Sequence, residues 1–225
     1  MEIAGLEEAS RLLGGAVLGP QELAAALGFD PLAALRGDER PAVARIPFGA
    51  ADLERARADG EMLVLRLARD PEGLLTMLRL AARLDGGLDP KVHKGVGYLL
   101  RDEWTIDEQP FAAAETCGTG WWLVRREPLA ATLNRTYREQ DAVLAALGPP
   151  PERPRRRSAA EIAFDTLCWH RAHGERLLSR AWDWSRSETI DRGYASLGEF
   201  GPDGLRVIAY SAAVRFGTLG VCPQR

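Results

Sequence analysis

The sequence predicts an α+β protein in which a helix-rich N-terminal region is followed by a capped helix and a small antiparallel β region. Helix start and stop signals alternate with short apolar runs up to residue 148, and four prolines then crowd residues 149–157. Beyond them, a capped helix precedes short aromatic and β-branched runs separated by turn residues, a pattern typical of antiparallel strands. The chain therefore divides into an N-terminal helical segment (1–45), an α+β region (46–148), a Pro/Arg linker (149–157) and a helix plus antiparallel β region (158–225).

Three helices are predicted before residue 60. Residues 4–14 and 20–27 each combine apolar positions with a glycine just past the end. Pro20 suits the first helical position, because an N–H there would have no helical partner, and Gly28 suits the position that follows a helix. Residues 50–59 are expected to form the third helix.

The next elements include the first strand. Residues 61–67 form an apolar run bounded by turn residues, which predicts a buried strand. Asp70-Pro71-Glu72 predicts the start of a helix, because a capping side chain precedes a proline and an acid. Further along, residues 120–125 predict a second strand, and Asn134 is expected to cap a helix that runs to Leu147.

The C-terminal third contains the strongest local signals. Ser158 and Glu161 match a capping box, in which each side chain bonds the backbone N–H of the other residue, so a helix is expected as far as His173. The sequence Gly-Pro-Asp-Gly at residues 201–204 predicts a hairpin turn, since Pro presets one turn angle and Gly accepts a positive φ. The expected strands lie around 182–184 and at 194–200, 205–210 and 213–222.

Composition limits the class of protein. Apolar residues make up 46 % of the chain, enough for a buried core, and a net charge of −3 gives no general basic surface for nucleic acid. The three cysteines are odd in number and far apart, which is poor material for disulfides and suits a reducing, cytoplasmic setting. No apolar run reaches the ~18 residues of a membrane span. The acidic start of the chain argues against a secretory leader.

One cluster has the residue types of a metal or thiol site. Cys168, His170 and His173 lie on one predicted helix, and the two histidines share a face because they are three residues apart. Two imidazoles can supply half of a zinc site, but no third ligand stands at a recognised spacing, so no cofactor is expected. A core cysteine with two partly exposed histidines explains the same residues. A metal- or thiol-dependent enzyme is therefore the first alternative function.

A DNA-associated protein is the second alternative. Residues 20–36 resemble the first helix and turn of a helix-turn-helix, and the arginines of residues 153–157 could contact phosphates. The segment after the turn offers a single arginine, whereas a recognition helix needs several basic and amide residues. A small helical pair and a solvated linker explain the same stretches.

Residues 46–225 resemble a family of uncharacterised bacterial proteins. The matching motifs are Ile46-Pro47-Phe48, Gly120-Trp121-Trp122-Leu123-Val124 and the closing Leu219-Gly220-Val221-Cys222, among others. No activity is assigned to that group, so the resemblance implies none for this chain.

The C-terminal third also resembles the end of a C-type-lectin-like fold, as found in sulfatase-modifying-factor domains and in the variable proteins of diversity-generating retroelements. The resemblance rests on an aromatic strand with a polar Ser/Arg segment at 182–187, a glycine-rich hairpin at 198–204 and an Arg-aromatic-Gly close at 214–217. It implies a ligand surface on the last strands. The outward residues of that surface would be Tyr194, Arg206, Ile208, Tyr210 and Arg215.

These features favour a non-enzymatic binding or interaction protein that uses its C-terminal β surface. Arginine and tyrosine are frequent anchors in recognition sites, and both occur among the five outward residues. The expected partner is a protein or a small-molecule ligand. Neither a nucleic acid nor a membrane is expected.

Overall fold

A computed structural model describes residues 3–85, 100–102, 109–149, 153–202 and 204–225, and its mixture of helices and strands confirms the α+β class. The helices are α1 (Leu6–Leu12), α2 (Pro20–Leu27), α3 (Arg40–Val43), α4 (Ala50–Ala58), α5 (Met77–Asp85), α6 (Pro110–Ala114), α7 (Tyr137–Ala146) and α8 (Ala159–His173), with a 3₁₀ turn η2 at Ala130–Thr132. The strands are β1 (Val17–Leu18), β2 (Glu61–Arg66), β3 (Arg69–Asp70), β4 (Gly73–Leu74), β5 (Leu100–Asp102), β6 (Gly120–Arg125), β7 (Trp182–Glu188), β8 (Tyr194–Gly201), β9 (Gly204–Tyr210) and β10 (Leu219–Gly220).

The N-terminal half contains a three-stranded sheet with the order β1-β2-β6. β1 lies parallel to β2, and β2 pairs antiparallel with β6 along its whole length. Every residue of β2 is buried, as a continuous apolar run in a central strand predicts. The predicted strand at 120–125 is confirmed, and the one at 61–67 ends one residue earlier than expected.

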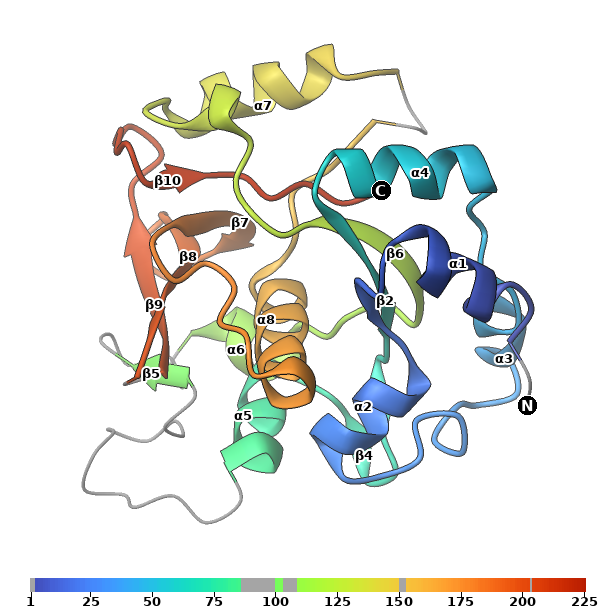
Figure 1. The fold of residues 1–225 in the computed structure, drawn as a ribbon. Coiled ribbons are helices and arrows are strands. Elements are labelled where there is room, and N and C mark those ends of the chain that lie inside the picture. The colour runs from blue at the N-terminus through green and yellow to red at the C-terminus, as the bar shows by residue number, and fades with distance from the viewer. Residues whose placement is uncertain (1–2, 86–99, 103–108, 150–152, 203) are drawn as a thin grey trace.

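The C-terminal half contains a five-stranded sheet with the order β10-β7-β8-β9-β5 (Figure 1). The predicted hairpin joins β8 to β9, with Gly201 opposite Gly204. The prediction of a purely antiparallel region is wrong, because β10 runs parallel to β7 and β5 runs parallel to β9. Most of the predicted strand 213–222 lies outside the sheet, since the carbonyls of Ala212 and Phe216 accept hydrogen bonds from the chain that enters α7.

Two predicted helices begin where their caps indicate. α2 starts at Pro20 and ends at Gly28, whose φ of 74° gives the left-handed conformation that closes a helix. At the start of α8 the Ser158 hydroxyl accepts the Glu161 N–H at 3.1 Å, and the Glu161 carboxylate accepts the Ser158 N–H at 2.7 Å. The capping box is therefore confirmed.

The cap of α7 is Thr136 and not the predicted Asn134. The Thr136 hydroxyl accepts a hydrogen bond from the N–H of Glu139, and the Glu139 carboxylate accepts one from the Thr136 N–H. Asn134 instead adopts a φ of 53°, in the left-handed region that asparagine tolerates in turns. A threonine with a glutamate three residues on is the stronger start signal of the two, because it satisfies two backbone donors.

The helix predicted from Asp70 begins only at Met77. The Asp70 carboxylate accepts the N–H groups of Glu72 and Gly73 at 2.8 and 2.9 Å, which closes the short β3–β4 hairpin in place of a first helical turn. Arg79 and Arg83 from α5 also bond this carboxylate. Burial raises the pKa of the Asp70 carboxyl, but these hydrogen bonds and charges outweigh it and lower the pKa to about 2.

Helix α8 lies between the two sheets and forms the centre of the molecule (Figure 1). It contacts α2, α5 and α6 as well as strands of both sheets. Ala159 to Trp169 are all buried, so the helix presents no exposed face over that length. One hydrophobic cluster includes Leu63 of β2, Phe164 of α8 and Val207 of β9. The N-terminal and C-terminal regions predicted from the sequence therefore share one core.

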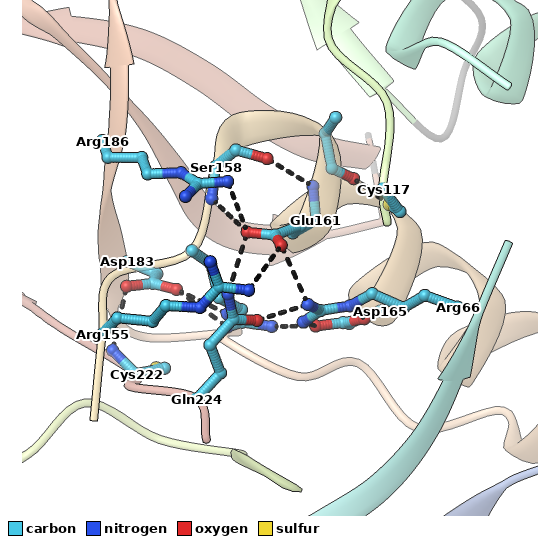
Figure 2. A network of polar contacts seen from close by, with 12 residues as sticks. Arg66, Cys117, Arg155, Ser158, Glu161, Asp165, Asp183, Arg186, Cys222 and Gln224 are labelled. Atoms are coloured by element: carbon cyan, nitrogen blue, oxygen red, sulfur yellow. Dashed lines mark hydrogen bonds and ion pairs between the residues drawn. The ribbon is translucent and has the colours of Figure 1, made fainter. Parts of the chain in front are cut away.

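Inside this core a network of charged side chains surrounds the first turns of α8 (Figure 2). Arg66 of β2 donates two hydrogen bonds to Asp165, at 2.7 and 2.5 Å. Arg157 donates to the same carboxylate at 2.6 Å and to Asp183 of β7 at 2.8 Å. All four side chains are buried. Burial disfavours the charged form of Arg157, but the carboxylates of Asp183 and Asp165 outweigh it and raise the pKa.

Glu161 forms the second part of the network. Its carboxylate accepts the Gln224 amide at 3.0 Å and lies 3.2 Å from the Arg66 guanidinium. Burial raises the pKa of Glu161, yet Arg66, the Ser158 N–H, Arg186 and Gln224 together lower it below its usual range. The charges of the network thus have partners from β2, α8, β7 and the C-terminal segment.

The predicted Pro/Arg linker is solvated over only part of its length. Arg153 and Arg155 are exposed, whereas Arg156 and Arg157 are buried. Arg155 pairs with Gln224 through backbone hydrogen bonds, as an extended segment does. The last two arginines of the predicted linker are therefore held by the protein: Arg157 bonds two buried carboxylates, and Arg156 bonds Asp141 and two backbone carbonyls.

Asp70→Asn is expected to remove stability in a pH-dependent way. The pKa of Asp70 is lowered from 3.8 to about 2, so its charged form stabilises the folded protein above pH 4. That stability, on the order of 1–2 kcal/mol, is lost as the pH falls from about 4 to about 2. Urea unfolding of both proteins should show a gap at pH 7 that closes towards pH 2. A gap that stays constant across this range would contradict the assignment.

Candidate functional site

Aromatic side chains gather on one face of the β7–β8–β9 part of the C-terminal sheet. In the sheet register Trp184 lies opposite Ser196, which lies opposite Ile208, and Tyr194 lies opposite Tyr210. Alternate residues of a strand point to the same face, so these side chains form one surface. We call this surface the aromatic face; it consists of Trp182, Trp184, Tyr194, Arg206, Ile208 and Tyr210, together with Tyr137 and Phe216 from neighbouring segments.

The rings of the aromatic face pack against one another in a chain. Tyr137 of α7 stacks on Tyr194 with ring centroids 3.9 Å apart, and its edge meets Trp184 at 5.1 Å. Tyr210 packs against Trp182, at 6.2 Å, and Phe216, at 5.1 Å. Such edge and stacked contacts hold each ring in one orientation.

Two arginines complete the face. The Arg206 guanidinium lies 5.5 Å from the Trp182 ring and forms an ion pair with Glu199. Arg156 lies 3.8 Å from the Tyr137 ring and bonds the carbonyls of Tyr137 and Trp184. The first is partly exposed and the second is buried.

The structure places four of the five residues predicted for a ligand surface on this face. Tyr194, Arg206, Ile208 and Tyr210 are each partly buried there. Arg215 stands apart and pairs with Glu139 of α7 at 2.7 Å. Arg215 therefore has a carboxylate partner at the edge of the face, as Arg206 has in Glu199.

Sequence reasoning missed Tyr137, Phe216 and Arg156. Tyr137 follows the cap of α7, and Phe216 lies in the loop before β10, so neither takes part in the two-residue period of the strands. Arg156 belongs to the arginine run at 153–157, which the sequence predicts to be a solvated linker. A capping box at Thr136 could have placed Tyr137 at a helix start, but no local signal connects that helix to the sheet.

Beneath the rings lie two polar atoms that lack a hydrogen-bond partner in the described part of the chain. They are the indole Nε1 of Trp184 and the hydroxyl of Ser196, both on fully buried side chains. An unsatisfied buried donor costs free energy comparable to a lost hydrogen bond. Ser187, a buried serine of the same sheet, differs because its hydroxyl accepts the Ala159 N–H and donates to Glu115.

The residues of the enzyme alternative do not meet at a common point. The His170 ring lies against Phe200, whereas the His173 ring lies over Trp169 and near the Val17 carbonyl. Within the described ranges, no group of three or more His, Cys, Asp or Glu side chains is arranged to hold a metal. Cys168 is fully buried, and burial raises its pKa well above the usual value, which disfavours the reactive thiolate.

The helix-turn-helix alternative also finds no matching geometry in the described residues. α2 buries Leu23 and Leu27 and packs on α8. Residues 31–34 form turns and not a second helix that could enter a groove. The predicted role of 20–36 as a small packed element therefore describes this segment better.

Comparisons with known proteins add no relative. No protein-family description, curated protein or solved structure matches this chain. None of the helices in the described ranges combines the length and apolar character needed to cross a membrane. The functional assignment therefore depends on the geometry of the described residues.

Ser196→Ala is expected to leave the free energy of unfolding unchanged or to raise it by up to about 1 kcal/mol, because it removes a buried hydroxyl without a partner. Ser187→Ala should lower it by about 1–3 kcal/mol, because the Ala159 N–H and the Glu115 carboxylate each lose a bond. Urea unfolding at pH 7 measures both. Equal losses for the two serines would contradict the distinction.

Proposed function

We propose that this chain is a non-enzymatic binding protein that recognises a protein partner through the exposed part of the aromatic face, around Phe216, Tyr210 and Arg206. The single observation that carries the proposal is the grouping of Phe216, Tyr210 and Arg206 beside Trp182. Aromatic residues and arginine are the side chains most enriched among energetic anchors of protein interfaces.

Exposure supports the side chains around Tyr210 and Phe216 over Trp184. Phe216 is 44 % exposed, whereas Trp184 is fully buried and in edge contact with Tyr137. Tyr210 packs against Phe216 and is itself half-buried. Rings that are already fixed by neighbours lose little conformational freedom on binding, so their contact area contributes more to affinity.

A C-type-lectin-like role for the last strands is the finer form of this proposal. The resemblance noted in the sequence implies a ligand surface there, and Arg206, Ile208 and Tyr210 share one face of β9. An enzymatic role has less support, because the described histidines and cysteines do not converge.

The proposal is tested by affinity capture on the immobilised chain, with extract of the native host, followed by titration of the captured partner. Phe216→Ala and the double variant Arg206→Ala/Tyr210→Ala should each weaken binding by about 30-fold or more, as loss of a hot-spot residue does. Leu74→Ala is the matched control, since Leu74 is 51 % exposed and lies on β4.

Far-UV circular dichroism should show that all variants fold like the wild type. Unchanged affinity in the face variants, or an equal loss in Leu74→Ala, would contradict this assignment of the binding surface.

A further inference from the structure

A second candidate site lies away from the aromatic face, where the C-terminal segment passes β6. It is a pocket of about 290 Å³ that brings together segments from four parts of the chain. Its size is at the lower end of the range for small-molecule sites. The lining residues are Phe48, Asp52, Trp122, Arg153, Arg155, Gln224 and Arg225.

Of the three arginines that line this pocket, only Arg225 has a close carboxylate partner among the described residues. Arg225 is held by Glu61 at 3.0 Å and lies 3.8 Å from Asp52. Arg153 donates only to the Gly148 carbonyl, at 3.1 Å, among the residues that the structure describes. Two residues apart on an extended segment, Arg153 and Arg155 line the same pocket.

Arg155 has only one distant ion pair. Its guanidinium is 3.8 Å from Glu161, whose carboxylate already serves Ser158, Gln224 and Arg66. Burial lowers the pKa of Arg155, and repulsion from Arg186 and Arg66 adds to the effect of burial, with Glu161 opposing it. A negative charge beside Arg155 would therefore be favourable.

Two aromatic rings give the pocket an apolar part beside its arginines. The Arg155 guanidinium lies over the Trp122 ring, 4.4 Å from the ring centroid, where the cation attracts the face of the ring. The indole Nε1 of Trp122 has no acceptor in the described part of the chain. Phe48 adds a second ring to the lining.

A larger hollow of the described surface also has more arginines than carboxylates in its lining. It has a volume of about 640 Å³ and is lined by four arginines and three carboxylates. Arg126 pairs with Glu175 there, and Arg125 lies near Asp59. The smaller pocket differs in the two aromatic rings that stand beside its arginines.

We propose that the pocket binds a small aromatic phosphate monoester, with the phosphate between Arg153 and Arg155 and the ring against Trp122 and Phe48. Arg153, which bonds only a carbonyl, and Arg155, whose one carboxylate is 3.8 Å away, match a dianion. A phosphate monoester carries about −1.5 to −2 charges at pH 7. Guanidinium groups also bond phosphate oxygens in pairs, which favours arginine at such sites.

Isothermal titration of the full chain with phenyl phosphate tests the proposal. Phenyl phosphate should bind, inorganic phosphate should bind about tenfold more weakly because it lacks the ring, and phenol should not bind. Arg155→Gln should weaken phenyl phosphate about tenfold or more, as should Arg153→Gln. Arg153 makes one contact to a carbonyl, so its variant keeps the test valid if Arg155→Gln disturbs the fold.

Arg180→Gln is the matched control, because Arg180 is an exposed arginine of the larger hollow. It should leave the affinity unchanged. The proposal is overturned if phenyl phosphate does not bind, if phenol binds equally well, or if Arg180→Gln weakens binding as much as the pocket variants. Binding of a thymidine oligonucleotide without binding of phenyl phosphate would also overturn it in favour of a phosphodiester site.

Discussion

Two buried arginines that share one buried carboxylate hold the halves of this molecule together. Arg66 comes from the N-terminal sheet, Arg157 from the extended segment before α8, and both bond Asp165 on α8. A charge buried without a partner costs several kcal/mol, so the Asp165 carboxylate is tolerated only while these two arginines stay in place. Arg66 also pairs with Glu161, and Arg157 also pairs with Asp183. Through Asp183 the same constraint reaches β7. The positions of both sheets relative to α8 therefore depend on this contact.

The segment that carries Arg157 also connects the network to both candidate sites. Neighbouring residues of an extended chain point to opposite sides, and next-but-one residues share a side. Arg155 accordingly lines the pocket beside Trp122, Arg156 lies against Tyr137 beneath the aromatic face, and Arg157 enters the network. Three consecutive arginines thus lie in three different surroundings. Because Arg156 and Arg157 are buried, they fix the side to which the exposed Arg155 points.

Local signals predicted much of the fold because they act within a few residues. Pro20 and Ser158 marked helix starts correctly, and the turn at 201–204 gave the hairpin. The network could not be predicted, since Arg66 ends an apolar run and its partner Asp165 lies far along the chain. The strand period placed Arg206 and Tyr210 on one face, but the rings of Tyr137 and Phe216 reach it from outside the sheet.

The most direct test of this account is the free energy of unfolding of Asp165→Asn, measured in urea against wild type and Glu72→Gln. Asp165→Asn leaves two buried arginines without their shared carboxylate, so a loss of about 3 kcal/mol or more is predicted. Glu72 pairs with Arg79 but is 72 % exposed at its side chain, so its variant should lose less than about 1 kcal/mol. Losses of the same small size in both variants would contradict the claim that this carboxylate holds the two halves together.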